Sequence, residues 1–209
     1  SILQKSVLSR IIRERYTEQL AEKYSISVTA EELDSEFDAV VAEAASEEEV
    51  VDTLNRLYQW TPEQFKQKVL LPYLLRSKLE TKIGQDQSLN ADAKTEADSV
   101  LTKINSGEIT FEDAAKQYSD DVTATSGGDL GFFGAGQMVT EFETAAFALQ
   151  PGETSGVVQT QFGYHIIRVT ERVAATDDAP EQVRASHILF QGVDLDTYTN
   201  EQLAEASIA

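Results

Sequence analysis

The sequence predicts an α+β protein in which an all-helical N-terminal domain precedes a domain with a small antiparallel sheet flanked by helices. Apolar residues recur at helical spacing through the first 83 residues, whereas the second half adds short apolar runs that are bounded by turn residues. The polar stretch Gly84–Asn90 separates the two patterns and is suited to a linker. We therefore expect one domain over residues 1–83 and another over residues 84–209.

Helix start signals divide the first domain. The spacing of apolar residues predicts a long first helix over residues 2–24. Thr29 and Glu32 form a capping box, in which each side chain accepts a hydrogen bond from a free N–H group, so a second helix starts there. Thr61 starts a later helix in the same way. Pro72 lies inside this helix and is expected to kink it, because proline has no N–H to donate.

The second domain mixes helices and strands. We expect helices over 91–104, 111–116 and 142–149, and strands over 157–160, 164–171 and 183–190. The glycine-rich segment 126–136 is expected to form turns that present apolar side chains to a groove. A phosphate cradle is disfavoured because no Gly-Lys-Ser/Thr follows these glycines.

Composition excludes several classes of function. The 209 residues include 36 acidic and 17 basic ones, which gives a net charge of −19. Nucleic acid is therefore not expected as the main partner, because phosphate binding depends on clustered Lys and Arg. The absence of cysteine excludes disulfides, thiol nucleophiles and iron–sulfur clusters. Most of the acidity lies in residues 84–209, which have 21 acidic and 6 basic side chains.

The chain has no apolar run that approaches the roughly 20 residues of a membrane span. It starts at Ser1 and enters a helical pattern at once, which is compatible with the removal of an upstream signal or membrane anchor.

The two histidines, His165 and His187, each lie in an apolar, strand-like run. Neighbouring strands can bring the two imidazoles together on one face of a sheet. The alternative is two separate core histidines, and spacing alone does not decide between them. A metal site is disfavoured because no third ligand lies at a suitable spacing. We expect no metal and no other cofactor.

Longer motifs carry a family resemblance. The run from Phe111 to Glu171 reads FEDAAKQYSDD and, further on, SGGDLGFFGAGQMVTEFETAAFALQPGETSGVVQTQFGYHIIRVTE. Together with VRASHILF, it resembles the parvulin family of peptidyl-prolyl cis–trans isomerases. The likeness covers most of residues 91–190. Through VTAEEL and a Thr-Pro-Glu helix start, residues 1–83 resemble more weakly the N-terminal chaperone region of the SurA/PrsA-like foldases of the bacterial envelope.

The resemblance implies which residues form the catalytic centre. His165 and His187 match the paired central histidines beneath the active groove, and Thr160 matches a hydroxyl that bonds to this pair. Asp121 matches a position that is cysteine in some parvulins and aspartate in many envelope members. We expect the network of His165, His187 and Thr160 to tune the electrostatics at Asp121, without acting as nucleophile or base.

The resemblance also implies a substrate groove. Three residues match the apolar pocket that takes the proline ring: Leu130, Met138 and Phe142. Phe162 matches a groove-side position that varies in the family. The basic loop that reads phosphate in the phospho-specific branch has no counterpart in this sequence, so phosphorylated substrates are not expected.

The order of the motifs departs from the family. Parvulins begin with the His-Ile-Leu strand, which here comes last, at Val183–Phe190. In one interpretation the domain is circularly permuted, and this strand returns to pair beside residues 164–169. In the other, it begins a truncated second repeat with a first helix over 199–206, and the first domain lacks a strand or borrows one from a neighbouring molecule. We favour the permuted domain because an open apolar sheet edge promotes aggregation.

Two functions follow from the resemblance. The first is a foldase that isomerises X–Pro bonds of unfolded polypeptides in the bacterial periplasm or cell envelope, with or without a membrane anchor. The alternative is a non-catalytic holdase-type chaperone that uses the parvulin-like domain as a binding scaffold. Client identity, the preferred residue before proline and the oligomeric state stay open.

Overall fold

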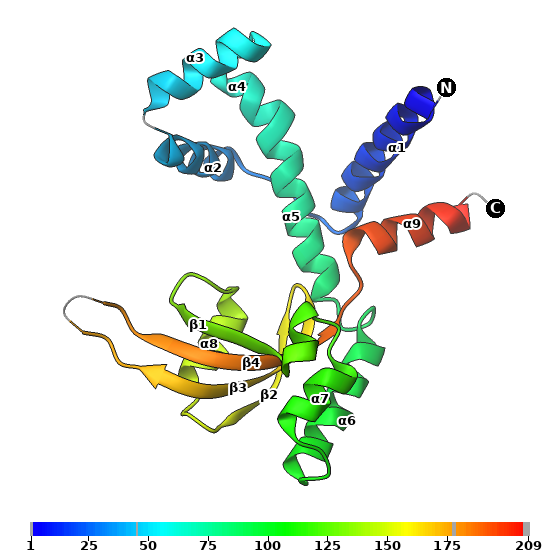
Figure 1. Ribbon diagram of the computed structural model, residues 1–209. Helices are drawn as coiled ribbons and strands as arrows, with labels where there is room; N and C mark the ends of the chain where they lie inside the picture. The colour runs from blue at the N-terminus through cyan, green and yellow to red at the C-terminus, as the bar shows by residue number, and fades with distance from the viewer. Residues whose placement is uncertain (1, 45, 177–178, 207–209) are drawn as a thin grey trace. The chain divides into compact units, whose positions relative to one another are not determined.

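The computed structural model describes residues 2–44, 46–176 and 179–206, and its described part forms two compact units (Figure 1). The first unit contains the chain up to Glu80 and again from Thr199, and the second contains Thr81–Tyr198. The division lies close to the predicted boundary at residue 83. The segment from Thr199 groups with the helical unit, not with the sheet-containing domain as predicted. One contact that links it there is the hydrogen bond from Arg13 Nη2 to Asn200 Oδ1, at 3.4 Å.

The first unit is helical, as predicted. Its elements are α1 (Ile2–Lys23), α2 (Ala30–Glu43), α3 (Glu47–Tyr58), α4 (Pro62–Phe65), the π-helical turn η1 (Lys66–Leu70), and α5 (Leu71–Gly84), whose last turn enters the second unit. Both predicted capping boxes are present, before α2 and before α4. A core of four buried side chains holds α2, α3 and η1 together: Leu33, Phe37, Leu54 and Leu70. Of the helices in the described ranges, none combines the length and the apolar character that a membrane crossing requires.

The helix around Pro72 is disturbed one turn earlier than expected. The π-helical turn at Lys66–Leu70 lies directly before α5, which carries Pro72 at its second position. Because proline cannot donate to the carbonyl four residues back, the regular hydrogen-bond ladder is interrupted there. A single π-helical turn is one of the ways in which a helix accommodates such an interruption.

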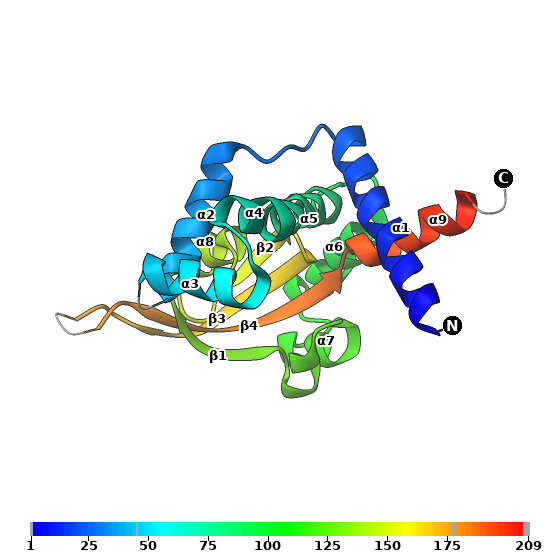
Figure 2. The same ribbon diagram turned by 90° about the horizontal axis from the view of Figure 1, so that it is seen from above.

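The second unit contains a four-stranded antiparallel sheet with the order β1-β4-β3-β2 (Figure 2). Its helical elements are α6 (Ala91–Asn105), α7 (Phe111–Tyr118), the 3₁₀ helix η2 (Val122–Ser126), α8 (Thr140–Ala148) and the start of α9 (Leu195–Ala206). The strands are β1 (Asp129–Gly134), β2 (Thr154–Thr160), β3 (Gly163–Val173) and β4 (Gln182–Gln191).

The prediction of turns alone between residues 126 and 136 is wrong, because strand β1 lies there. The strand is irregular, because its register against β4 shifts between Asp129 and Phe132. Gly131, inside this shift, has a φ of +71°. A bulge with a left-handed glycine disturbs the period-2 pattern that identifies strands, and this explains the missed element.

Strand β4 lies between β1 and β3 in the interior of the sheet. Its pairing with β3 runs from Gly163 opposite Gln191 to Val173 opposite Gln182. The segment 183–190 thus completes the sheet of its own chain, beside residues 164–169. A central strand supplies hydrogen bonds to both neighbours, so the sheet depends on β4 more than on either edge strand.

Side-chain alternation along β3 and β4 separates the two faces of the sheet. Tyr164, Ile166 and Ile188 pack with α6 and α7 on one face. Ile167 and Val183 pack on the other face with α8 and Phe133 (Figure 1). Because side chains two residues apart share a face, the odd-numbered His165 and His187 lie on the face that α8 covers.

Candidate active site

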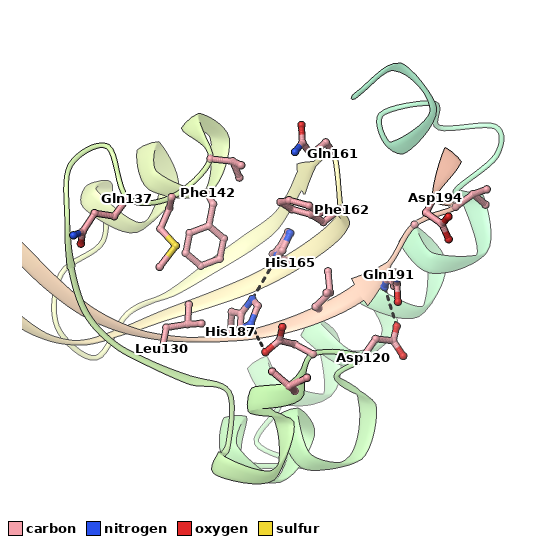
Figure 3. Close-up of a pocket in the computed structure, with 17 residues that line it drawn as sticks. Asp120, Leu130, Gln137, Phe142, Gln161, Phe162, His165, His187, Gln191 and Asp194 are labelled. Atoms are coloured by element: carbon pink, nitrogen blue, oxygen red, sulfur yellow. Dashed lines mark hydrogen bonds and ion pairs between the residues drawn. The ribbon is translucent and has the colours of Figure 1, made fainter. Parts of the chain in front are cut away.

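A pocket of about 640 Å³ opens on the α8 face of the sheet, entirely within the second unit (Figure 3). Its apolar end is formed by Leu130 of β1, Met138 of the loop after β1, and Phe142 of α8. Phe162, from the turn between β2 and β3, lies on its rim with about half of its surface exposed. The four residues predicted for substrate binding therefore line one cavity. They share it with three of the four predicted catalytic residues, Asp121, His165 and His187.

The two histidines form a pair beneath this pocket. His165 lies opposite Leu189 and His187 lies opposite Ile167, so the two histidines are diagonal neighbours on adjacent strands. Their Nδ1 atoms are 3.2 Å apart and their rings are stacked with an interplanar angle of 17°. The ring of Phe142 is nearly perpendicular to both imidazoles, at centroid distances of 5.3 and 5.7 Å. The interpretation as two separate core histidines is therefore wrong.

Thr160 hydrogen-bonds to Nε2 of His165, the ring nitrogen that does not face His187. It is fully buried at the end of β2, and its Oγ1 lies 2.8 Å from His165 Nε2. The same Oγ1 accepts a hydrogen bond from the backbone N–H of Phe162 at 3.1 Å. Because Oγ1 is the acceptor in that hydrogen bond, the hydroxyl group can donate its own proton to His165 Nε2.

Asp121 lies at the other end of the histidine pair. It caps the 3₁₀ helix η2, and its Oδ1 accepts the backbone N–H of Thr123 at 2.8 Å. The same oxygen lies 3.3 Å from His187 Nε2. Within the described chain, this buried nitrogen has no well-aligned hydrogen-bond acceptor. The contact with Asp121 is therefore mainly electrostatic.

These contacts give the network one consistent direction. A carboxylate beside His187 Nε2 favours a proton on that nitrogen. His187 Nδ1 is then the acceptor, and the proton between the two rings belongs to His165 Nδ1. His165 Nε2 in turn accepts from Thr160. Each imidazole is thus neutral, with one donor and one acceptor nitrogen.

Burial explains why both rings are neutral. Desolvation, and to a lesser extent the neighbouring His187, lower the pKa of His165 to about 3. Desolvation also lowers the pKa of His187, although the contact with Asp121 opposes this shift. Partial burial raises the pKa of Asp121, but the hydrogen bonds from Thr123 and the contact with His187 outweigh it, so that pKa lies below its usual range. At neutral pH the site therefore holds one carboxylate and two uncharged imidazoles.

A close backbone contact fixes His187. Gly128, directly before β1, has a φ of +79°, and its carbonyl accepts the backbone N–H of His187 at 2.9 Å. A Cβ at position 128 would lie 2.0 Å from the His187 carbonyl oxygen. This is the structural reason for one glycine of the glycine-rich segment.

Several residues of the pocket were not predicted from the sequence. Two are carboxylates, Asp120 and Asp194, and three are amides, Gln137, Gln161 and Gln191. Most lie at the ends of elements, where periodicity carries little information. The adjacency of Asp120 to Asp121 was an available signal. No group of three or more His, Asp or Glu side chains that could hold a metal occurs among the described residues.

Comparisons with known proteins find relatives of this chain. Residues 76–171 match the family model of the rotamase domain, described as the PPIC-type PPIASE domain. The foldase protein PrsA of Bacillus subtilis is 47% identical over 114 residues, which cover 54% of this chain and 38% of that protein. PrsA of Geobacillus kaustophilus is 38% identical over 192 residues, which cover 80% of this chain and 62% of that protein. The chaperone SurA of Bordetella avium is 41% identical over 100 residues, which cover 47% of this chain and 20% of that protein.

The crystal structure of PrsA from Bacillus anthracis is similar to this chain with a TM-score of 0.34 at 24% identity, over 96% of this chain and 88% of that one. The chain spans between about a third and two thirds of the length of the first curated relatives that it matches. Residues 76–171 thus match a domain of the PPIC, or parvulin, type, and the chain is similar to the PrsA and SurA proteins.

Proposed function

We propose that this chain is a foldase that catalyses cis–trans isomerisation of X–Pro bonds in unfolded polypeptides. One observation carries the proposal: the apolar end of the pocket adjoins a buried network of Thr160, His165 and His187 that ends at the Asp121 carboxylate. The apolar end is suited to a proline ring, and the carboxylate supplies a fixed charge beside it.

Isomerisation needs no bond to be broken. The barrier of about 18–20 kcal/mol comes from amide resonance, which is lost when the bond twists. Resonance also places partial negative charge on the carbonyl oxygen of the planar amide. An apolar, partly dry pocket with a carboxylate near that oxygen destabilises the planar form more than the twisted one, and so lowers the barrier.

The histidine pair acts through Asp121 in this proposal. A histidine whose pKa is about 3 is a poor base at neutral pH. Two neutral rings locked by Thr160 can instead hold an N–H group toward Asp121 and fix the position of its charge. Thr160, His165 and His187 are accordingly positioning residues, and Asp121 is the group that we expect to face the substrate.

A peptide isomerisation assay tests this proposal. We expect the chain to accelerate exchange of a tetrapeptide that contains proline, and Asp121→Ala to lower kcat/KM by about tenfold or more. Glu96→Gln removes one exposed charge on α6 and is the matched control. No acceleration by the unaltered chain would refute the isomerase. Full activity of Asp121→Ala would remove only the role of the carboxylate.

A second candidate function is client holding by the helical unit. Among the described residues of this unit, eight large side chains are more than a third exposed: Val7, Leu8, Ile11, Ile12, Leu57, Tyr58, Val69 and Tyr73. Tyr58 also stacks on Trp60 at a centroid distance of 4.9 Å. Exposed apolar groups of this kind can bind unfolded chains. Suppression of aggregation that is lost in Tyr58→Ser but kept in Asp121→Ala would separate holding from catalysis.

We further propose that the isomerase domain is a circular permutation of the usual parvulin order. The interior position of β4 supports this, as does its pairing with both β1 and β3 of the same chain. Deletion of residues 174–209 should unfold the second unit, because it leaves β1 without a partner and β3 paired only with β2. A stable and active remainder would refute the permuted order.

We also propose that the protein works outside the cytoplasm, in the bacterial periplasm or cell envelope. The resemblance to envelope foldases supports this location. The absence of cysteine also makes the fold insensitive to an oxidising compartment. Fractionation of cells that express the complete gene, with a cytoplasmic marker protein as control, tests the location. Recovery of the protein with the cytoplasmic marker alone would refute it.

A further inference from the structure

The pocket has a charged end as well as an apolar one. Asp120, Gln191 and Asp194 lie at the end opposite Leu130 and Phe142 (Figure 3). Asp121 contributes a third carboxylate to the lining. The residues that line the pocket include no lysine and no arginine. All the charged side chains that line the cavity are therefore acidic.

Neutral groups hold the two outer carboxylates in place. Asp120 Oδ2 accepts the backbone N–H of Gln191 at 2.8 Å. Asp194 accepts the backbone N–H and the hydroxyl of Thr197, at 2.9 and 2.6 Å. These hydrogen bonds lower the pKa of Asp194, so it is ionised at neutral pH.

Neither outer carboxylate is neutralised by a cation among the ion pairs of the described chain. Asp129 on β1 shows the contrast, since Arg184 binds it at 2.7 Å. The charges at the pocket are thus fixed in position but uncompensated.

A further feature of the pocket fits a long cationic side chain. Val122 lines the pocket next to Asp121 and is 91% exposed, so it offers an apolar surface at the edge. Lys and Arg side chains lay an aliphatic stem on such a surface while the charged head reaches polar groups.

We propose that Asp120 and Asp194 form a subsite that selects client segments with a lysine or arginine beside the proline. This inference rests on the proposed isomerase function and adds a substrate class to it. The apolar end takes the proline ring, and the acidic end takes the cationic side chain. Acidic and phosphorylated residues at that position are disfavoured by repulsion in a partly enclosed cavity.

A peptide series tests the subsite. Lys, Leu or Glu is placed in turn at the two positions before the proline and at the one after it, and kcat/KM is measured for each peptide. At one or more of these positions we expect the Lys peptide to exceed the Glu peptide by about tenfold at low salt. The ratio should shrink at 1 M salt, where the Debye length is about 3 Å.

Substitution assigns the effect to these residues. The double variant Asp120→Asn/Asp194→Asn keeps a side-chain oxygen as acceptor for Gln191 and Thr197 but removes both charges. We expect its Lys/Glu ratio to fall toward one, whereas Glu96→Gln keeps the ratio of the unaltered chain. Circular dichroism verifies that each variant is folded, and the salt dependence of the unaltered chain gives an independent measurement.

The outcomes distinguish failure of the proposed subsite from failure of the proposed isomerase activity. Equal rates for Lys and Glu at every position, with the Leu peptides still turned over, would overturn the subsite alone. A ratio that persists in the folded double variant would assign the selectivity elsewhere and also overturn it. No turnover of any peptide would refute the isomerase itself.

Discussion

The Nδ1 atoms of His165 and His187 lie 3.2 Å apart, so one proton between them must serve both rings. Two protonated Nδ1 atoms would repel each other, and two bare ones would leave buried acceptors unpaired. The network carries a charge at only one end, where Asp121 lies 3.3 Å from His187 Nε2. This asymmetry sets the direction of every hydrogen bond from Thr160 to the pocket.

The first prediction concerns tautomers. His165 should carry its proton on Nδ1 and His187 on Nε2, because of the carboxylate at Asp121. The chain has only two histidines, so ¹⁵N-histidine labelling gives two imidazole spin systems that report this directly. In Asp121→Ala the preference should weaken. The opposite pair of tautomers in the unaltered chain would contradict the direction of the network.

The second prediction concerns pH. His165 has its pKa lowered to about 3 in the folded chain, whereas an unfolded histidine titrates near 6.5. Between these values unfolding takes up a proton, so stability falls as pH falls. The slope is about 1.4 kcal/mol per pH unit for this residue, and His187 adds to it in the same direction.

Hydrogen exchange of β3 and β4 amides at pH 6.5 and 5.5 measures this loss in the second unit. The single tryptophan, Trp60, lies in the first unit and does not report it. His165→Asn should reduce the slope. Equal stability at the two pH values would show that the rings are protonated in the fold.

The third prediction is that Thr160→Val destabilises the second unit by about 2–4 kcal/mol. Valine has the same shape but leaves His165 Nε2 and the Phe162 N–H without partners in a buried place. Thr160→Ser is the control, because it keeps the hydroxyl and loses one methyl group, at a cost of about 1 kcal/mol. The free energy of unfolding of each variant in urea, monitored by hydrogen exchange, distinguishes the two. Equal losses would mean that the methyl group, not the hydroxyl, matters.

The fourth prediction compares two glycines that have a positive φ. Gly128→Ala places a Cβ 2.0 Å from the His187 carbonyl oxygen, whereas Gly107 has no atom within 4 Å of the same position. Gly107→Ala should therefore cost only the left-handed backbone strain of about 1–2 kcal/mol. Gly128→Ala should cost more and should also shift the imidazole resonances of His187. Similar thermal shifts for the two variants would show that β4 yields easily at this contact.

The fifth prediction concerns Asn90, which is buried. Its Nδ2 donates to the carbonyls of Ile83, Gly84 and Asp86, and its Oδ1 accepts the N–H of Val193 at 2.6 Å. Asn90→Ala leaves these groups unpaired and should cost about 2–4 kcal/mol. Because Val193 precedes Asp194, the variant should also reduce the Lys/Glu ratio. The exposed Asn55→Ala serves as control, and an unchanged midpoint of urea unfolding for Asn90→Ala would contradict this role.

Much of the fold could be predicted because its signals are local. The capping residues Thr29 and Thr61 mark helix starts by their own hydrogen bonds, and strands β3 and β4 have long apolar runs. Strand β1 could not be predicted, because its glycine and register shift remove the alternation that marks a strand. The prediction that the segment from Thr199 belongs to the sheet-containing domain was also wrong. Tertiary contacts decide to which unit this segment belongs, and the sequence shows only that it is helical.

The site followed from the family motifs more than from spacing. Alternation shows that His165 and His187 can share a sheet face, but only the register, which offsets them by two residues, determines their contact. Asp120 and Asp194 are more than 70 residues apart in the sequence, and no local pattern connects them. A charged end made from two loops can be recognised only after the chain has folded.

The interior position of β4 has a consequence for synthesis on the ribosome. Strands β1, β2 and β3 leave the ribosome before β4, yet β1 pairs with β4 and with neither β2 nor β3. The hairpin of β2 and β3 can form early, but β1 has to wait with its apolar side chains uncovered. The last step in the folding of this unit therefore has to wait until β4 has been made, and until then the apolar side chains of β1 stay exposed.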